Sequence, residues 1–320
     1  MDRRKFLRSL ALTGAAAVGG TVAIKEDGKM GILTQSVNAQ TKRRAAANYD
    51  LVAVLGGEPE AMFLKAIAEM GGMGKFIKKG DKVVVKPNIG WDKTPELAAN
   101  TNPKLVSAVI KECFKAGAKE VVVFDHTCDD WRKAYANSGI EAAAKAAGAK
   151  VVPAHQESYY RQVSLPNGKS LKSTKIHEAI VNCDKWINIP VLKNHGGAQM
   201  TIAMKNYMGI VWDRGFFHAN DLQQCIADVC TYAKRPVLNI VDAYRLMKTS
   251  GPRGRSAADV VLTKGLFLSQ DIVAVDTAAV NFFSQVRDMP LNKVTHISKA
   301  QDHKLGIMDL SKLKVRRVRV

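Results

Sequence analysis

The order of apolar and polar positions predicts a chain in which strands and helices alternate. Short apolar runs bounded by glycine, proline or charged residues predict strands over residues 50–55, 82–86, 120–124, 150–152, 186–189, 236–241, 260–262 and 266–268. Apolar positions three or four residues apart predict helices over residues 60–70, 103–116, 139–147, 221–232 and 271–283. A Pro-Asn-Gly turn at residues 166–168 predicts a β-hairpin. We therefore expect an α/β fold: a largely parallel sheet with helices on both faces and one β-hairpin insertion.

One stretch, residues 186–209, combines a predicted strand, a polar loop and a predicted helix. The apolar residues 186–189 predict a buried strand that ends at Pro190, since proline cannot donate a ladder hydrogen bond. Residues 193–197 form the loop. One helix face is then predicted from the apolar residues Met200, Met204, Tyr207 and Met208. This order is how α/β folds build ligand sites at strand C-termini. The alternative is an ordinary connection that carries a solvated lysine.

Polar side chains follow several of the predicted strands, and the carboxyl ends of parallel strands meet at one edge of a sheet. Lysines gathered there can bind a phosphate or carboxylate, or one can act as an amine whose pKa is lowered by burial. The candidate catalytic residues are Lys193, His195, Lys205 and Asp242. The candidate ligand-binding residues are Lys86, Asn88, Asn206, Arg253 and Asp276. Each of these taken singly also fits a helix cap, a turn residue or a surface charge.

Lys193 and Lys205 lie 12 residues apart, on the predicted loop and helix. We expect them to meet over one anion only if the helix N-terminus leans across the sheet edge, where its free N–H groups would add to the attraction. Because two close ammonium groups repel each other, neither lysine is expected to stabilise the fold without a ligand.

A metal site is the competing use of the same edge. The candidate ligands are Asp125, His126, His195 and His218, and a divalent or transition metal would suit them. No H-E-x-x-H spacing occurs to support this site. The sequence also lacks a G-x-G-x-x-G after the first strand and a nucleophile elbow, so we expect neither nucleotide binding there nor Ser-His-Asp catalysis.

Four segments resemble the core of the uncharacterised family called domain of unknown function 362. They are residues 192–210 (LKNHGGAQMTIAMKNYMGI), residues 83–88 (VVVKPN), residues 241–242 followed by 251–254 (VD and GPRG), and residues 271–276 (DIVAVD). Together they cover a family-like core of about residues 50–285. The resemblance implies the fold and a set of candidate positions, but it implies no reaction.

The resemblance also implies that many relatives carry a ferredoxin-like module. The five cysteines here form no C-x-x-C-x-x-C run, so no iron–sulfur cluster of that type is expected. Cys113 and Cys225 fall in apolar helical patterns and are expected to be buried thiols. The sequence does not assign disulfide pairs.

The chain is strongly basic, with a net charge of +19 over 320 residues. Such a charge attracts anions. The basic residues lack the interleaved aromatic residues of single-strand binders, so nucleic acid is not the expected partner. We expect an exported enzyme, redox or isomerase-like, that acts on an anionic small molecule. One alternative is a non-catalytic module that binds an anion, metal or cofactor and serves an envelope partner such as a redox protein. The other is a structural envelope protein.

The N-terminus predicts export. Arg3 and Arg4 precede a short, glycine-interrupted apolar stretch, as in a twin-arginine signal, and the small residues 37–39 fit a cleavage site. We therefore predict a signal peptide over residues 1–39, a linker over 40–48 and a single α/β domain over 49–320. The twin-arginine translocase would then deliver the protein to the periplasm. The alternatives are an uncleaved membrane anchor and a basic N-terminal helix of a cytosolic protein.

If Arg3 and Arg4 are the recognition pair, changing both to lysine should leave the protein in the cytoplasm, because the translocase reads the arginine pair. Fractionation of cells that express the full chain would measure this. Normal accumulation of the variant in the periplasm would contradict the export assignment.

Overall fold

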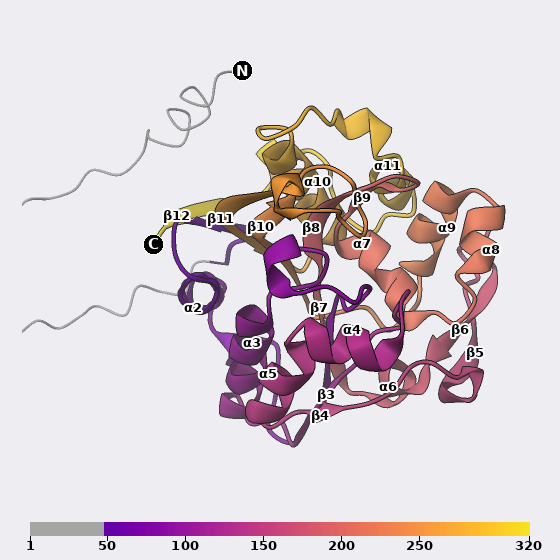
Figure 1. Ribbon diagram of the computed structural model, residues 1–320, viewed down its shortest axis with the longest axis horizontal. Coiled ribbons are helices and arrows are strands. Elements are labelled where there is room, and N and C mark those ends of the chain that lie inside the picture. The colour runs from indigo at the N-terminus through magenta and orange to yellow at the C-terminus, as the bar shows by residue number, and fades with distance from the viewer. Residues whose placement is uncertain (1–47) are drawn as a thin grey trace, which may run out of the picture. The chain divides into compact units, whose positions relative to one another are not determined.

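The computed structural model describes residues 48–320, so the predicted signal peptide and nearly all of the predicted linker lie outside the described residues. A ten-stranded sheet runs through this part of the chain (Figure 1). Its main order is β12 (Val315–Arg319), β1 (Leu51–Leu55), β11 (Val260–Ser269), β10 (Leu238–Met247), β7 (Lys185–Ile189), β2 (Lys82–Pro87), β3 (Glu120–Val123) and β4 (Lys150–Val151). β8 (Val191–His195) pairs with β10, and β9 (Gln199–Thr201) pairs with β8.

Most strand pairs are parallel, and the predicted fold class is confirmed. The pairs β10–β7, β7–β2, β2–β3 and β3–β4 are parallel, whereas β11 is antiparallel to both β1 and β10. The predicted hairpin is also present, as a separate two-stranded sheet of β5 (Tyr160–Ser164) and β6 (Ser173–His177).

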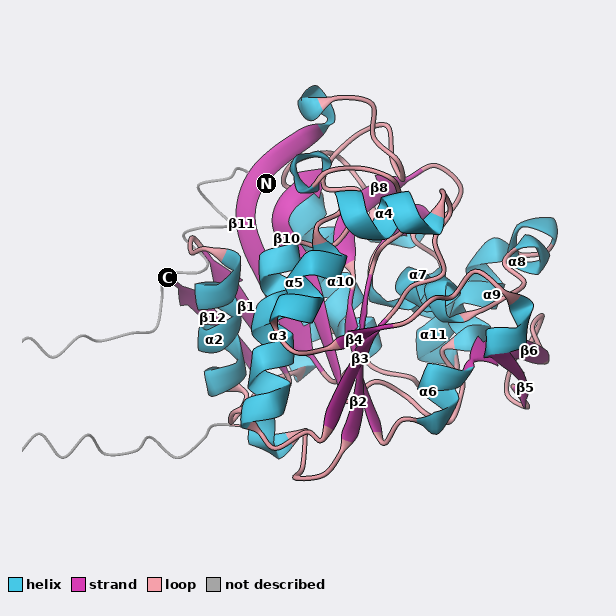
Figure 2. Ribbon diagram, turned by 60° about the horizontal axis from the view of Figure 1, so that its bottom comes forward, coloured by secondary structure: helices cyan, strands magenta, loops and turns pink. Residues whose placement is uncertain are grey.

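Helices cover both faces of the sheet (Figure 2). One apolar core lies under α2 (Pro59–Glu69), α3 (Pro103–Lys115), α4 (Trp131–Asn137) and α5 (Ile140–Ala146). The other lies under α6 (Glu178–Asn182), α7 (Ala203–Asn206), α8 (Gly215–Ala219), α9 (Leu222–Val229), α10 (Ile272–Phe283) and α11 (His296–Asp302). Within residues 48–320, no helix combines the length and the apolar character needed to span a bilayer.

The strand predicted to end at Pro190 continues beyond it. β7 and β8 lie on either side of this residue, and both pair with β10 in the parallel sense. Pro190 has no N–H, but its carbonyl accepts from the amide of Asp242 at 2.8 Å. On the side of the sheet where β7 pairs with β2, the last pair is Ile189 with Pro87. Pro190 follows that pair, so its lack of an N–H breaks no hydrogen bond to β2. Lys193 and His195 therefore lie on a strand rather than on the predicted loop.

The single helix predicted over residues 200–208 is wrong. Thr201 ends β9, α7 is only four residues long, and a 3₁₀ turn, Tyr207–Ile210, follows it. The apolar residues used for that prediction are all buried in one core, so their spacing reflects burial on several sides rather than one helix face. Similarly, β10 runs to Met247, past its predicted end, and β11 is one continuous strand.

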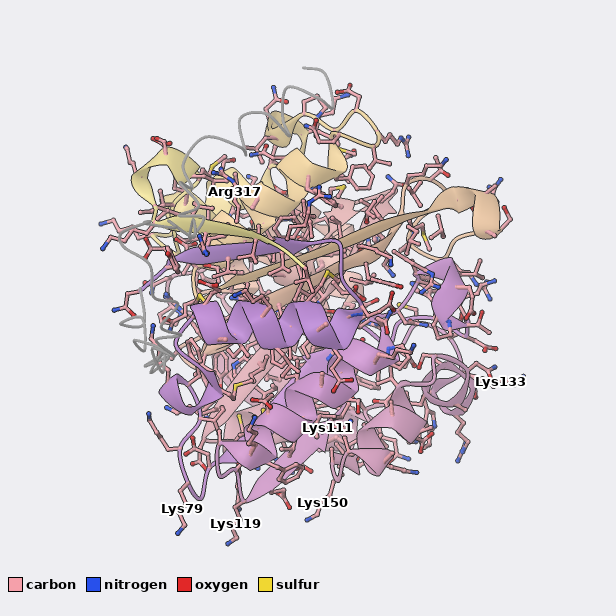
Figure 3. The ribbon with its side chains drawn as sticks, turned by 90° about the vertical axis from the view of Figure 1, so that its left-hand side faces the viewer. Lys79, Lys111, Lys119, Lys133, Lys150 and Arg317 are labelled. Carbon is pink, nitrogen blue, oxygen red and sulfur yellow. The ribbon has the colours of Figure 1, made fainter. Side chains whose placement is uncertain are left out.

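Exposed lysines gather at the edge where the parallel strands begin. Lys79, Lys119 and Lys150 lie close to the starts of β2, β3 and β4 (Figure 3). Lys150 is paired there with Glu120. The opposite edge carries the polar residues that follow these strands, so these three lysines lie away from it.

Candidate functional site

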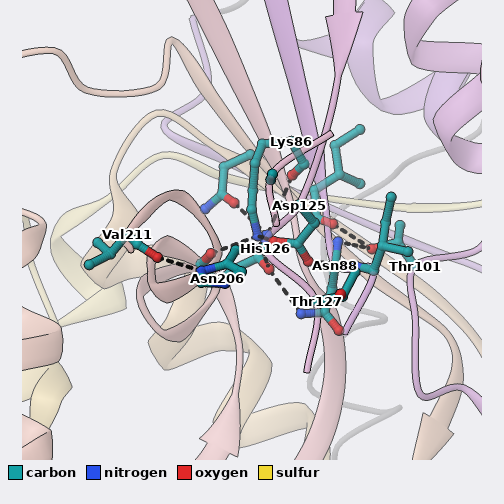
Figure 4. A network of polar contacts seen from close by, with 12 residues as sticks. Lys86, Asn88, Thr101, Asp125, His126, Thr127, Asn206 and Val211 are labelled. Carbon is teal, nitrogen blue, oxygen red and sulfur yellow. Dashed lines mark hydrogen bonds and ion pairs between the residues drawn. The ribbon is translucent and has the colours of Figure 1, made fainter. Parts of the chain in front are cut away.

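The ammonium group of Lys86 is completely buried at the end of β2. Its Nζ lies 2.8 Å from Asp125 Oδ1, just after β3, and donates to both the backbone oxygen and Oδ1 of Asn206, at 2.7 Å each (Figure 4). Burial lowers the pKa of Lys86, and the charge of Asp125 opposes that shift. Three oxygens from two other elements thus enclose one cation, which fixes β2, β3 and α7 relative to one another.

Buried amides extend this network across the sheet. Asn206 Nδ2 donates to Asn188 Oδ1 at 2.8 Å, and Asn188 Nδ2 donates to Ala203 O at 2.9 Å and to Asn239 Oδ1 at 3.0 Å. On the other side, Asn88 Nδ2 donates to Asn206 Oδ1 at 3.1 Å. Asn188 and Asn239 sit within β7 and β10, so sheet positions and α7 share one set of hydrogen bonds.

Two predicted site carboxylates hold backbone amides instead. Asp276 on α10 accepts from the amides of Ala203 and Met204, at 2.8 and 3.0 Å, and so caps α7. Asp242 accepts from the amides of Asn102 and Tyr244, at 2.7 and 3.0 Å. Burial raises the pKa of Asp276 to about 7 and that of Asp242 to about 6, while these amides oppose the shift. Neither lines the cavity described next, and both carboxylates are occupied by backbone amides.

A cavity of about 410 Å³ lies over this network, at the carboxyl ends of β2, β3 and β8. Its charged lining consists of Lys193, Lys205, Arg214 and Asp125, and the Asp125 carboxylate is already paired with Lys86. The rest of the lining is Asn88, Gly90, Trp91, His126, Cys128, His195, Thr201, Asn206, Met208, Gly209, Gly215, His218 and Pro252. Five of the strand-end residues predicted to converge line this cavity: Asn88, Asp125, His126, Lys193 and His195. Lys86 lies in the network beneath it, and Asp242 does not line it. The cavity has an excess of positive charge.

Lys193 is held by oxygen acceptors. It is 1% exposed, and its Nζ donates to the carbonyl of Ala99 and, at 3.2 Å, to Asn88 Oδ1. The pKa of Lys193 is lowered to about 7, mainly by burial, and the positive charge of Lys205 acts in the same direction. The amine therefore titrates near neutral pH, which suits a group that exchanges protons.

Lys205 differs from Lys193 in having no fixed acceptor. Within residues 48–320 its partly buried side chain makes no hydrogen bond or ion pair, although it lines the same cavity. Burial lowers the pKa of Lys205 to about 8, and the charges of Arg214 and Lys86 act in the same direction. The predicted help from helix N–H groups is wrong, because Asp276 occupies the amides that begin α7.

The three histidines of the predicted metal set line the same cavity but differ in hydrogen bonding and exposure. His195 Nδ1 accepts from the amide of Ala198 at 3.0 Å, and burial and the nearby lysines lower the pKa of His195 far below its usual value. His126 Nδ1 donates to Val211 O at 2.8 Å, and burial lowers its pKa to about 4. His218 is exposed at the rim. In the part of the chain that the structure describes, no three His, Cys, Asp or Glu side chains gather as a metal cluster. A bound metal stays a prediction.

Sequence reasoning missed Arg214, which lies in a segment without a recognisable motif. Its guanidinium donates to His126 O and Thr127 O, both at 2.8 Å, and to Cys128 Sγ at 3.3 Å. It therefore fixes the loop after β3 and brings a cation to the cavity wall. Arg253, predicted to bind a ligand, is exposed and lies over the ring of Trp91, 5.8 Å from its centroid, at the cavity edge.

Residues 83–281 match the family described as Domain of unknown function (DUF362). The chain belongs to this family. It is also 26% identical over 246 residues to the thylakoid-associated protein sll1697 of Synechocystis sp. (strain ATCC 27184 / PCC 6803 / Kazusa), a match that covers 74% of this chain and 72% of the relative. Among solved structures, the lactate racemase apoprotein from Thermoanaerobacterium thermosaccharolyticum is similar, with a TM-score of 0.48 and 12% identity. That match covers 75% of this chain and 58% of the racemase chain.

Among the glycines that line the cavity, Gly209 leaves the least room for a side chain. A Cβ there would overlap Asp125 Oδ1 and Lys86 Nζ. Gly209→Ala should therefore lower the free energy of unfolding by about 3–5 kcal/mol, the cost of breaking a buried ion pair. Gly74→Ala is the matched control, because a Cβ at Gly74 meets nothing within 4 Å, and we expect a change of less than about 0.5 kcal/mol. Equal denaturant midpoints for the two variants would contradict this account.

Proposed function

We propose that this protein is an isomerase-like enzyme that moves a proton on an anionic small molecule bound in the 410 Å³ cavity. The observation that carries the proposal is the pair of lysines in one cavity: the pKa of Lys193 is lowered to about 7 and that of Lys205 to about 8. At neutral pH about half of the Lys193 amine is neutral and able to accept a proton, whereas Lys205 is largely charged.

Lys193 is the proposed base. A neutral amine has two N–H groups and one lone pair, and the two acceptors already described, Ala99 O and Asn88 Oδ1, match the two N–H groups. The lone pair then remains for a proton taken from carbon, and Lys193 lines the cavity in which that carbon would lie. Asn88 is held in turn by Asn206, so the amine is oriented before a ligand arrives.

Lys205 and Arg214 are the proposed anion-binding groups. The Lys205 ammonium has no acceptor among the described residues, so a carboxylate or phosphate would supply one. As the C–H bond breaks, its electron pair would move toward the anionic group, where the positive charge of Lys205 would stabilise it. The proton would then return from Lys193 to the same carbon or to its neighbour.

A non-catalytic anion-binding module is the second candidate. It needs the positive charge of the cavity but no amine that titrates near neutrality, so the lowered pKa of Lys193 favours the enzyme. The predicted export, which depends on residues outside 48–320, would place either protein in the envelope.

Solvent exchange tests the catalytic proposal. In D₂O, the full chain should catalyse incorporation of deuterium next to the carboxylate of at least one short hydroxy- or oxocarboxylate, as followed by proton NMR. Lys193→Met should reduce the exchange rate about 10²–10⁴-fold, the usual contribution of a general base. Lys111→Met, which removes an exposed lysine on α3, is the matched control and should keep the full rate (Figure 3).

The two candidates separate in the same samples. Inorganic phosphate or acetate should raise the melting temperature of the protein under either one. A thermal shift without exchange in any carboxylate would leave the binding module as the function. Full exchange in Lys193→Met would remove this lysine from the mechanism.

The dependence of stability on pH tests the environment of Lys205. Its pKa is about 8 in the folded protein and near 10.5 in an ordinary setting, so the unfolded chain binds more protons between these values. Stability should therefore rise with pH across this window. Lys205→Met should reduce the slope, because it removes one such group, and should raise the melting temperature at pH 8 in the absence of anions. Urea unfolding at several pH values measures both effects, and an unchanged slope would contradict the burial of this charge.

A further inference from the structure

Cys128 is the one exposed cysteine of the chain, and all five cysteines lie in residues 48–320. It follows β3 in the loop that Arg214 holds. The other four thiols are buried, and burial raises the pKa of Cys113 to about 12 and those of Cys183 and Cys225 to about 11. A reagent that attacks thiols in the folded protein therefore meets Cys128 first.

The sulfur of Cys128 has cationic surroundings. The guanidinium of Arg214 donates to Sγ at 3.3 Å, and since arginine has only donors, the sulfur must accept. Cys128 lines the cavity together with Lys193 and Lys205. The charged forms of both lysines therefore add to the positive potential that Arg214 brings to the sulfur.

A second group in the cavity also lacks a partner. Thr201 lines the cavity and is 3% exposed, and within the described residues its hydroxyl has no hydrogen-bond partner. The hydroxyl is open to the cavity rather than enclosed by protein, so a ligand oxygen can bond to it there. Thr201 pairs with Lys193 across β8 and β9, so this hydroxyl belongs to the same wall as the proposed base.

We propose that Cys128 is a nucleophile for anionic electrophiles, in which a carboxylate or phosphate lies next to a reactive carbon. The cations would hold the anionic group while the sulfur attacks that carbon. An S–C bond forms, the bond from carbon to the leaving group breaks, the leaving group departs with the electron pair, and the thiol proton passes to solvent. This inference rests on the proposed function only in requiring that the cavity bind anions.

Iodoacetate and iodoacetamide provide the test, because they place the same reactive carbon next to an anionic and a neutral group. The full chain is treated with each, and labelling of the Cys128 peptide is timed by mass spectrometry. We expect the ratio of the iodoacetate rate to the iodoacetamide rate to exceed that of glutathione about tenfold, through local enrichment of the anion. Phosphate should slow labelling by iodoacetate.

Matched variants separate the cavity cations from the overall positive charge. Lys205→Met and Arg214→Gln should each lower the ratio toward that of glutathione, whereas Lys111→Met, which removes an equal charge elsewhere, should not. Circular dichroism checks folding, and if Arg214→Gln unfolds, Lys205→Met alone decides the point.

A ratio equal to that of glutathione, or faster labelling of another cysteine, would overturn the proposal. Phosphate thermal shift and carboxylate exchange are measured on the same preparation. If phosphate raises the melting temperature and carboxylate exchange occurs, but the ratio of the iodoacetate to the iodoacetamide rate equals that of glutathione, the role of Cys128 is rejected and the proposed function stands. A raised ratio without exchange would support Cys128 and reject the proton-transfer function.

Discussion

The burial of the Lys86 ammonium is the constraint on which the site depends. A cation without water costs several kcal/mol unless oxygens surround it, and here Asp125 and Asn206 supply them. Meeting that need sets the distance between β3 and α7 and turns the Asn206 amide toward Asn188 and Asn88. Asn88 Oδ1 in turn accepts a hydrogen bond from Lys193 Nζ. The position of the proposed base is therefore a consequence of a charge that the ligand never touches.

The site separates two kinds of positive charge. Lys86 is neutralised within the protein, whereas Lys205 has no partner in the described chain and Arg214 is bonded to carbonyls and a sulfur. Only the second kind leaves an attraction for a ligand to use. A site in which every cation was paired with a carboxylate would be more stable but would bind anions weakly. The unpaired cations therefore lower stability and strengthen the binding of an anionic ligand.

The sequence predicted at which edge of the sheet the site lies, but not which side chains bond to one another there. Lys86, Asn88, Asp125 and Lys193 converge as expected, because parallel strands place their carboxyl ends together. The roles of Asp242 and Asp276 could not be read from sequence, since a carboxylate that caps a helix and one that faces a ligand follow the same patterns. Arg214 carried no signal because its place depends on how a loop folds back over the strand ends. The buried Asn188 and Asn239 did carry one: each is a polar residue inside an apolar strand.

Gly209 constrains which substitutions the site can accept. The space that its missing side chain leaves is filled by the Lys86–Asp125 pair, so the three positions form one steric and electrostatic unit. Substitutions within such a unit are not additive. A relative that replaced the ion pair with smaller apolar residues would no longer need glycine here, and a larger residue at 209 would then cost little. The three positions should therefore change together or not at all, and a chain that has lost the glycine should also have lost the buried charge.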